Sequence, residues 1–190
     1  MNVYDFDQTI FYPDSSYWFS RQCLNRHPLL YLLWLPEMAV VGLLYLFRLV
    51  SKERFKEAIF SYLPRLKDAE GELRLFWQKN ENRIPAWYLQ QKRPDDVIIS
   101  ASTDFLLRPI ADKLGVELIA SEMDMHSGKA TGLTCWGEEK VRRFYATHPD
   151  AVVENFYSDS YKDTPMAEIA KKAFMVKNKA QTLVPWKFKK

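Results

Sequence analysis

The sequence has 190 residues, of which 47% are hydrophobic and 15% aromatic. A chain of this length and composition forms about one domain with a packed core, or one domain that carries a sizeable insertion, and is not disordered. The 27 basic and 24 acidic residues leave a formal net charge of only +3. A nucleic-acid binder normally concentrates basic residues on one face, so we expect no nucleic-acid partner.

The chain begins with a short apolar and acidic run over residues 2–6, which predicts a strand that ends in a loop. No basic segment followed by an apolar segment precedes this run, so we expect no secretory leader and a cytoplasmic location. Cys23 and Cys135 are the only cysteines. Because they are far apart in a chain of this kind, we interpret them as reduced packing residues and not as a disulfide.

No convincing strand is predicted between residues 14 and 93. Prolines mark the joints of successive helices there, since proline fits the start of a helix and disfavours helix in the residue before it. The predicted helices cover residues 15–25, 28–34, 37–50, 52–62, 69–80 and 85–91.

The apolar stretch over residues 28–50 has the composition of a membrane segment. A span needs roughly 18 or more apolar residues with few charges, and here Pro36 and Glu37 split the run into two shorter pieces. We therefore favour buried helices of a helical insertion over a membrane span. A surface that rests on a membrane or on a lipid tail lies between these two alternatives.

From residue 95 onward, strands and helices alternate, with a hairpin-like stretch at 127–135. This pattern predicts an α/β fold, a three-layer Rossmann-like parallel sheet whose central strand is 2–6. Residues 1–13 and 94–190 would form this core domain, and residues 14–93 would form an inserted all-helical cap domain. The predicted strands are 97–99, 116–120, 152–157 and 174–176, and the predicted helices are 104–114, 138–147 and 164–172.

Polar residues follow the predicted strands where ligands bind in such sheets, beyond the carboxyl ends. They are Asp5 and Asp7 after the first strand, Ser100 and Ser102 after the second, and Asp159 and Asp163 after the fourth. Lys140 opens a helix between them. We expect these side chains to converge on one crevice.

The types of these side chains indicate metal-assisted phosphate chemistry. Asp5 and Asp7 point to one side of a strand and repel one another, so the site needs a shared proton or a cation. Asp159 can add a third oxygen ligand, and carboxylates without paired His or Cys favour Mg²⁺. Ser100 and Lys140 can bind phosphate oxygens, and an aspartate can itself be the nucleophile.

Four motifs of this sequence resemble those of the haloacid dehalogenase superfamily, and of its phosphoserine-phosphatase-like subfamily. Asp5-Phe6-Asp7-Gln8-Thr9 resembles the first motif, DxDxT, and Ile98-Ile99-Ser100-Ala101-Ser102 resembles the second. Residues 132–141 are similar to the stretch that leads to the motif-three lysine, and residues 157–163 to the acidic fourth motif. Each motif alone is weak, but four in the right order are specific together.

The resemblance implies a Mg²⁺-dependent phosphatase with a phospho-aspartate intermediate. Asp5 would be the nucleophile and a metal ligand, while Asp7 would be the general acid and base and bind the metal through its carbonyl. Asp159 would complete the metal site, and Asp163 would orient the metal shell or Lys140. The phosphate-binding residues implied are Thr9, which also braces the loop, Ser100, Ala101 and Lys140, the last of which is also catalytic. Dehalogenase members lack the second aspartate, so Asp7 favours phosphoryl chemistry.

Three positions depart from the family pattern or bear on the substrate. Gln8 stands where glycine is common, which affects the shape of the loop. Phosphoserine phosphatases read the amino acid with an acidic residue and a cap arginine; Asp14 lies near the first position, but Phe60 stands at the second. An apolar cap cannot satisfy a zwitterion, so we expect a small-molecule or lipid-linked phosphomonoester other than phosphoserine.

Other interpretations remain open at this point. Asp163 is as well placed to cap the helix that begins at Thr164 as to take a chemical role. Ser102 is better placed to cap the helix that begins at Asp104 than to bind phosphate. For the whole chain, the alternative is a protein that binds a membrane or a partner through its apolar cap, with little or no catalysis. Peripheral membrane contact through the cap is compatible with both functions. The sequence indicates no oligomeric state.

Overall fold

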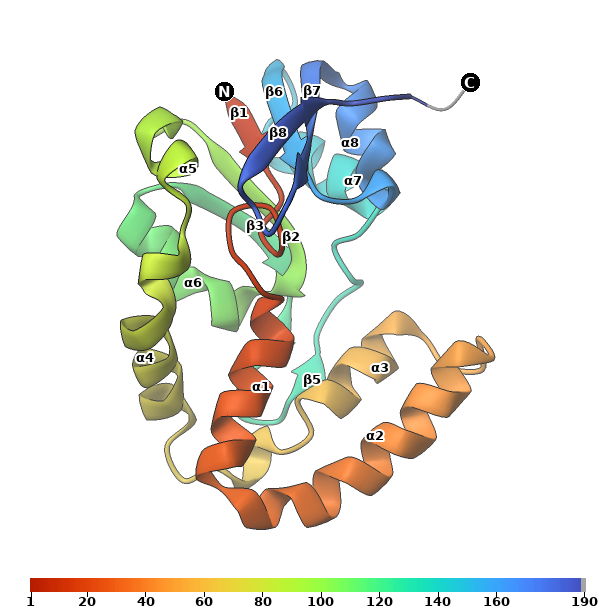
Figure 1. The fold of residues 1–190 in the computed structure, drawn as a ribbon. Helices are drawn as coiled ribbons and strands as arrows, with labels where there is room; N and C mark the ends of the chain where they lie inside the picture. The colour runs from red at the N-terminus through yellow and green to blue at the C-terminus, as the bar shows by residue number, and fades with distance from the viewer. Residues whose placement is uncertain (189–190) are drawn as a thin grey trace.

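The computed structural model describes residues 1–188 and shows a six-stranded sheet with helices on both faces (Figure 1). The strand order is β3-β2-β1-β6-β7-β8; all neighbours are parallel except β7 and β8. The strands are β1 (Asn2–Tyr4), β2 (Val97–Thr103), β3 (Glu117–Ser121), β6 (Val153–Ser158), β7 (Ala170–Lys177) and β8 (Thr182–Pro185). The predicted α/β class is confirmed, and β1 lies between β2 and β6 as expected.

Alternate residues of the strands build two separate cores, because successive side chains of a strand point to opposite faces. Tyr4 and Ile98 pack on one face with α4 (Ala69–Asn80), α5 (Ala86–Gln91) and α6 (Asp104–Leu114). Their neighbours Val3 and Val97 pack on the other face with α7 (Glu138–Thr147) and α8 (Thr164–Glu168). The helices therefore cover both faces and leave the strand ends open.

Three helices lie beyond the carboxyl end of the sheet (Figure 1). They are α1 (Ser15–Arg26), α2 (Tyr31–Leu46), which follows the 3₁₀ turn η1 (Pro28–Leu30), and α3 (Lys52–Ile59). The Asp14 carboxylate caps α1 by accepting from Tyr17 N at 2.8 Å, and Ser51 Oγ caps α3 by accepting from Arg54 N at 3.1 Å. Side chains of this type satisfy backbone donors that a helix start leaves free.

Short 3₁₀ turns connect the remaining elements of the helical part. These turns are η2 (Leu63–Arg65) and η3 (Glu81–Arg83), and a further one, η4 (Tyr161–Asp163), precedes α8. Every element between residues 15 and 91 is helical in the described chain. The division into a core domain and a cap at residues 14 and 93 stays a prediction.

The prediction and the structure differ at four points. Pro36 does not break the helix, and α2 continues through it. The proline removes one backbone hydrogen bond, and the packing of α3 along α2 offsets this loss. The helix predicted at 164–172 ends at Glu168, because residues from Ala170 pair with β6. The hairpin lies earlier than predicted, with β4 (Met123–Asp124) paired to β5 (Lys129–Ala130), and β8 was not predicted.

The preference for buried helices over residues 28–50 is wrong. Val41 is the one buried residue of α2, and the outer side of the helix is exposed. The stretch Pro28–Leu46 is long and apolar enough to cross a membrane by length and composition. The break at Pro36 was the reason to expect two short buried helices, and the break does not exist.

Trp77 joins the helical segment to the sheet. Its ring packs edge-on against Phe6 and Phe11, with centroids 6.0 and 5.4 Å away, and its Nε1 donates to the Leu106 carbonyl at 2.7 Å.

Trp77→Ala should lower the free energy of unfolding by about 3–5 kcal/mol, since it leaves a large cavity. Urea denaturation would measure this. Leu133→Ala, at an exposed position, is the control; equal effects of the two changes would contradict the assignment.

Candidate active site

A cavity of about 380 Å³ lies at the carboxyl ends of β1, β2 and β6. The structure brings together there nearly all of the residues predicted from the strand ends and motifs. Those that line the cavity are Asp5, Asp7, Ser100, Ala101, Ser102, Lys140, Asp159 and Asp163. Thr9 is the exception, since it is fully buried and does not line the cavity.

The loop after β1 presents both aspartates. Asp5 N donates to the Tyr157 carbonyl at 2.8 Å, which extends the pairing of β1 with β6 by one residue. The chain then turns tightly, and Gln8 adopts φ 58° in the left-handed region, which accounts for the glycine common at this position. Thr9 Oγ1 accepts from Asp159 N at 3.0 Å. Its position agrees with bracing the loop and not with touching a phosphate.

Lys140 lies at the centre of the site. Its Nζ donates to Asp5 Oδ1 and to Asp163 Oδ2, both at 2.8 Å. Burial disfavours the charged ammonium, but the two carboxylates raise the pKa of Lys140 above its ordinary value. The same Asp163 oxygen accepts from Ser158 Oγ at 2.8 Å. Asp163 occupies the N-cap position of α8 but makes no side-chain capping bond, so the capping alternative is wrong.

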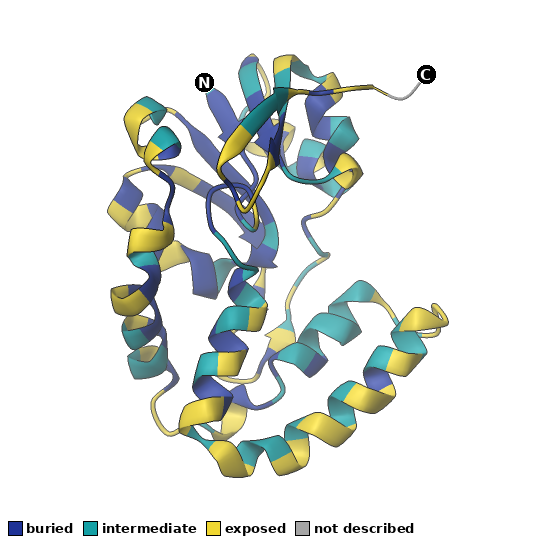
Figure 2. Ribbon diagram, viewed as in Figure 1, coloured by how far each residue is buried: buried dark blue, intermediate teal, exposed yellow. Residues whose placement is uncertain are grey.

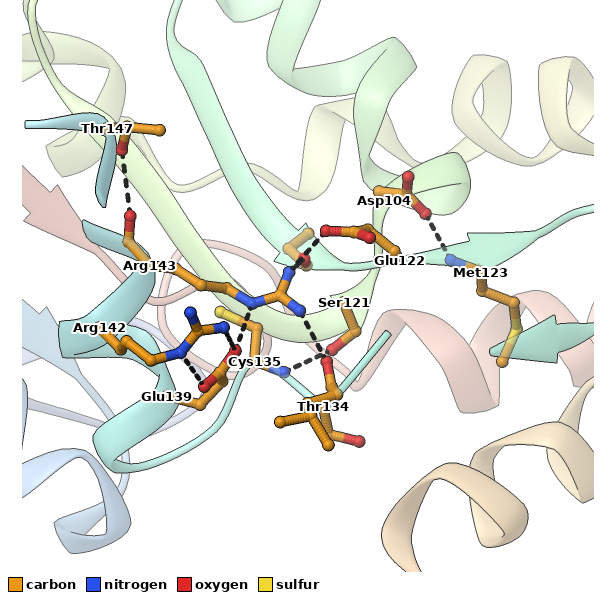
Figure 3. Close-up of polar contacts among 12 residues, drawn as sticks. Asp104, Ser121, Glu122, Met123, Thr134, Cys135, Glu139, Arg142, Arg143 and Thr147 are labelled. Atoms are coloured by element: carbon orange, nitrogen blue, oxygen red, sulfur yellow. Dashed lines mark hydrogen bonds and ion pairs between the residues drawn. The ribbon is translucent and has the colours of Figure 1, made fainter. Parts of the chain in front are cut away.

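A polar network fixes the helix that carries Lys140 (Figure 3). Gly137 precedes α7 as its N-cap residue and has φ 59°, which favours glycine. The Arg143 guanidinium donates to the Ala120 carbonyl at the end of β3, to the Leu133 carbonyl, and to Glu139 one turn back, at 2.8–2.9 Å. Figure 3 shows the Arg143 side chain reaching from α7 toward Glu139 and Glu122. Because these bonds hold α7 against β3, Lys140 has a fixed approach to Asp5.

Asp7 is held in place by two donors. Its Oδ1 accepts from Ser15 N at 2.6 Å, and its Oδ2 accepts from the Ser102 hydroxyl. Burial raises the pKa of Asp7 well above its ordinary value, and the charge of Asp14 raises it further. The interpretation of Ser102 as a helix cap is wrong, because Thr103 takes the N-cap position of α6. A carboxyl with a raised pKa in a cavity is suited to proton transfer.

The site holds more negative charge than Lys140 can neutralise. Burial raises the pKa of Asp5 to about 7; Lys140 opposes this shift, while Asp163 and Asp159 add to it. Burial and then Asp163 raise the pKa of Asp159. In the described part of the chain, the Asp159 carboxylate has no ion pair. A carboxylate without an ion pair beside Asp5 is suited to bind an added cation.

The available donors fit Mg²⁺. They are oxygens of Asp5, Asp159 and the Asp7 backbone, a donor set that suits a hard cation. Within residues 1–188, no group of three or more His, Cys, Asp or Glu side chains is arranged to hold a metal ion. Two carboxylates and one carbonyl would thus leave positions for water and substrate, and Mg²⁺ normally keeps several waters.

Sequence reasoning missed the contribution of α3. Lys56 Nζ donates to the Ala101 carbonyl at 2.6 Å and to Ser121 Oγ at 2.9 Å, and its burial lowers its pKa to about 8. Lys52, one turn earlier, places Nζ 3.0 Å from the Trp136 ring centroid. Both lysines line the cavity, so α3 forms one of its walls. Their i, i+4 spacing was the only signal, and it is common to solvated helices.

Phe60 does not reach the cavity. It is fully buried, and its ring packs edge-on against Phe105 at 5.4 Å. The basic side chains that α3 sends into the cavity are Lys52 and Lys56, of which Lys56 lies one turn before Phe60. Asp14, which caps α1, also lines the cavity. The cavity therefore contains an acidic residue, Asp14, and has lysines of α3 where an arginine was the comparison.

Comparisons with known proteins agree with this architecture. The model of the haloacid dehalogenase-like hydrolase family matches residues 3–168. A protein of unknown function from Bordetella pertussis Tohama I has a similar structure, with a TM-score of 0.72 and 21% identity, over 93% of this chain and 89% of that one. No curated protein gives a significant match.

Two further solved structures share the fold. A phosphoserine phosphohydrolase-like protein from Francisella tularensis subsp. tularensis SCHU S4 is similar with a TM-score of 0.57 and 18% identity, over 93% of this chain and 88% of that one. A probable phosphoserine phosphatase from Vibrio cholerae has a TM-score of 0.63 and 12% identity, over 90% of this chain and 55% of that one. Identities this low establish the fold alone.

The position of Lys140 between two carboxylates predicts a large effect on stability. Lys140→Met should lower the free energy of unfolding at neutral pH by about 3–5 kcal/mol, because it leaves two buried carboxylates without a counter-charge. Lys113→Met is the matched control; Lys113 also pairs with a carboxylate, Glu81, at 2.6 Å, but on the exposed surface. Chemical denaturation of both variants measures the difference. A Lys140 variant as stable as the control would contradict the central role of this ion pair.

Proposed function

The chain belongs to the haloacid dehalogenase-like hydrolase family, and we propose that it is a Mg²⁺-dependent phosphatase that forms a phospho-aspartate intermediate on Asp5. The observation that carries this proposal is the position of the Asp5 carboxylate in the cavity. One of its oxygens is held by Lys140 at 2.8 Å. In the described part of the chain, no side chain donates to the second oxygen of Asp5. That oxygen is therefore available to attack.

In the first step, the free oxygen of Asp5 attacks the phosphorus atom, and the bond between phosphorus and the leaving oxygen breaks. Asp7 gives its proton to the leaving oxygen; its raised pKa supports a protonated carboxyl at this stage. The Lys140 ammonium and the Ser100 hydroxyl face the same cavity and would hold the phosphoryl oxygens. Positioning and charge neutralisation account for most of the catalysis in such reactions.

In the second step, Asp7 is ionised and takes a proton from water. The water oxygen attacks the phosphorus atom, the bond to Asp5 breaks, and phosphate and a free carboxylate result. Lys52 and Lys56 of α3 also line the cavity.

Asp5, Asp159 and the Asp7 carbonyl would hold the cation. When bound, Mg²⁺ supplies positive charge that offsets the surplus of carboxylates and the charge of the phosphoryl group. Asp163 would act through Lys140, which it contacts at 2.8 Å. Within this function the substrate is a phosphomonoester, either a small molecule or lipid-linked, and the expected cytoplasmic location stays a prediction.

Removal of the metal should abolish turnover. We expect hydrolysis of p-nitrophenyl phosphate to stop after thorough chelation and to return with Mg²⁺ but not with Zn²⁺, because the donors are all oxygens. Colorimetric phosphate release measures this. The same assay separates the phosphatase from the alternative of a binding protein with little catalysis, which would release no phosphate in either condition. Activity that persists in the chelator would count against the metal assignment.

Asp5→Asn should abolish turnover and leave the fold intact, because an amide of the same shape is not a nucleophile. Steady-state hydrolysis of p-nitrophenyl phosphate with Mg²⁺ tests the rate, and circular dichroism tests the fold. Asp150→Asn, at an exposed position away from the cavity, is the matched control and should retain full activity. Near-normal turnover by the Asp5 variant would assign the nucleophile elsewhere.

A further inference from the structure

The outer side of α2 is an exposed apolar surface. The leucines and the valine on this side are more than half exposed. Figure 2 shows exposed positions recurring along the helix. We call this surface the outer face of α2; it consists of Leu32, Leu35, Val40, Leu43 and Leu46. Surface helices normally place polar residues on the side away from the core. An exposed apolar surface of this extent marks a binding partner.

The helix carries almost no charge that would keep this face in water. Between residues 28 and 47 the one charged residue is Glu37. Its carboxylate turns toward α3 and accepts from Arg54 Nη2 at 2.9 Å. The inner side of α2 is already used, since Tyr45 stacks on Phe55 of α3 at 4.4 Å. The outer face therefore needs an apolar occupant that is not part of the described chain.

The sheet excludes a membrane span for this helix. A span would place the chain before residue 28 and the chain after residue 47 on opposite sides of the membrane. However, β1 precedes α2 and pairs with β2 and β6, which both follow it. The ion pair between Asp5, which precedes α2, and Lys140, which follows it, also requires both parts of the chain on one side of the membrane. The helix must therefore lie along a surface, as interfacial helices do.

A second cavity opens between α1, α2 and α3. Its volume is about 520 Å³, and its walls are mainly apolar side chains, among them Leu24, Trp34 and Met38. It shares Asp14, Phe55 and Ile59 with the active-site cavity, so the two adjoin. A molecule with a phosphate at Asp5 and an apolar tail can therefore occupy both.

Charge at the end of α2 favours an anionic surface. Arg48 is exposed between Phe47 and Leu49, which are exposed themselves, and it has no ion pair in the described residues. Helices that lie at the headgroup level of a bilayer combine apolar side chains that insert with cations beside them. A second copy of the chain would offer the same apolar face and the same cation, which gives no charge complementarity.

We propose that the outer face of α2 docks on an anionic phospholipid bilayer and that the cavity between α1, α2 and α3 takes the tail of a lipid phosphomonoester, whose phosphate reaches Asp5. This inference rests on the proposed phosphatase function and names its substrate class. The bilayer supplies the apolar environment that the outer face of α2 lacks.

Vesicle flotation tests the docking surface independently of catalysis. The full chain, in chelator, should float with vesicles of equal parts phosphatidylcholine and phosphatidylserine. The variant with Leu32→Ser, Leu35→Ser and Leu43→Ser should bind about a hundredfold more weakly, from the loss of three inserted leucines. Leu133→Ser, at an exposed position outside α2, should bind as the unchanged protein does. Equal binding by both variants, or dimerisation in solution without flotation, would overturn the proposal.

Substrate comparison tests the tail cavity. Lysophosphatidic acid and glycerol 3-phosphate carry the same phosphoester with and without a tail. We expect kcat/KM for the lipid to be at least about tenfold higher, since a buried tail adds apolar contact. Equal values, or a preference for phosphoserine, would overturn the lipid assignment while p-nitrophenyl phosphate is still hydrolysed. No hydrolysis of any of these substrates would instead overturn the phosphatase function, and flotation would still report on the docking surface.

Discussion

One buried ammonium group organises the site. Lys140 Nζ contacts Asp5 from the end of β1 and Asp163 from the segment after β6, so three parts of the chain that are distant in sequence meet at a single charge. A buried carboxylate without a counter-charge would be costly, and two of them could not be adjacent. The position of α7, its anchoring through Arg143 and the pairing of β1 with β6 all serve to keep this contact. The carboxylate of Asp159 is left without an ion pair in the described chain, so it is the group to which the site can add a cation.

The α/β part was predictable because its local signals agree with its tertiary structure. The bounds of α6 and α7 match the prediction, since Gly115 ends α6 in the left-handed region and Gly137 precedes α7. The strand ends located Asp5 and Asp159 because a parallel sheet brings its carboxyl ends to one edge. The roles proposed for these residues rest on the resemblance of the motifs, while their distances and pKa shifts required the structure.

The parts that could not be predicted depend on contacts between elements. Lys56 is in sequence an ordinary helix lysine, and only the packing of α3 over β2 brings its Nζ to the Ala101 carbonyl. Ser102 precedes a helix, a position typical of a cap, but the nearby Asp7 carboxylate binds its hydroxyl instead. The residues of α2 are apolar on all sides, so their pattern cannot indicate which side the protein covers.

The helix α3 connects the apolar surface to the chemistry. On one side it contacts α2 through Arg54 with Glu37 and through Phe55 with Tyr45. On the other side, Lys56 donates to the Ala101 carbonyl within β2. Phe55 also belongs to the wall shared by the two cavities. α2 makes most of its contacts with α3 and with its own turn η1. The same helix α3 therefore supports the outer face of α2 and lines the candidate active site.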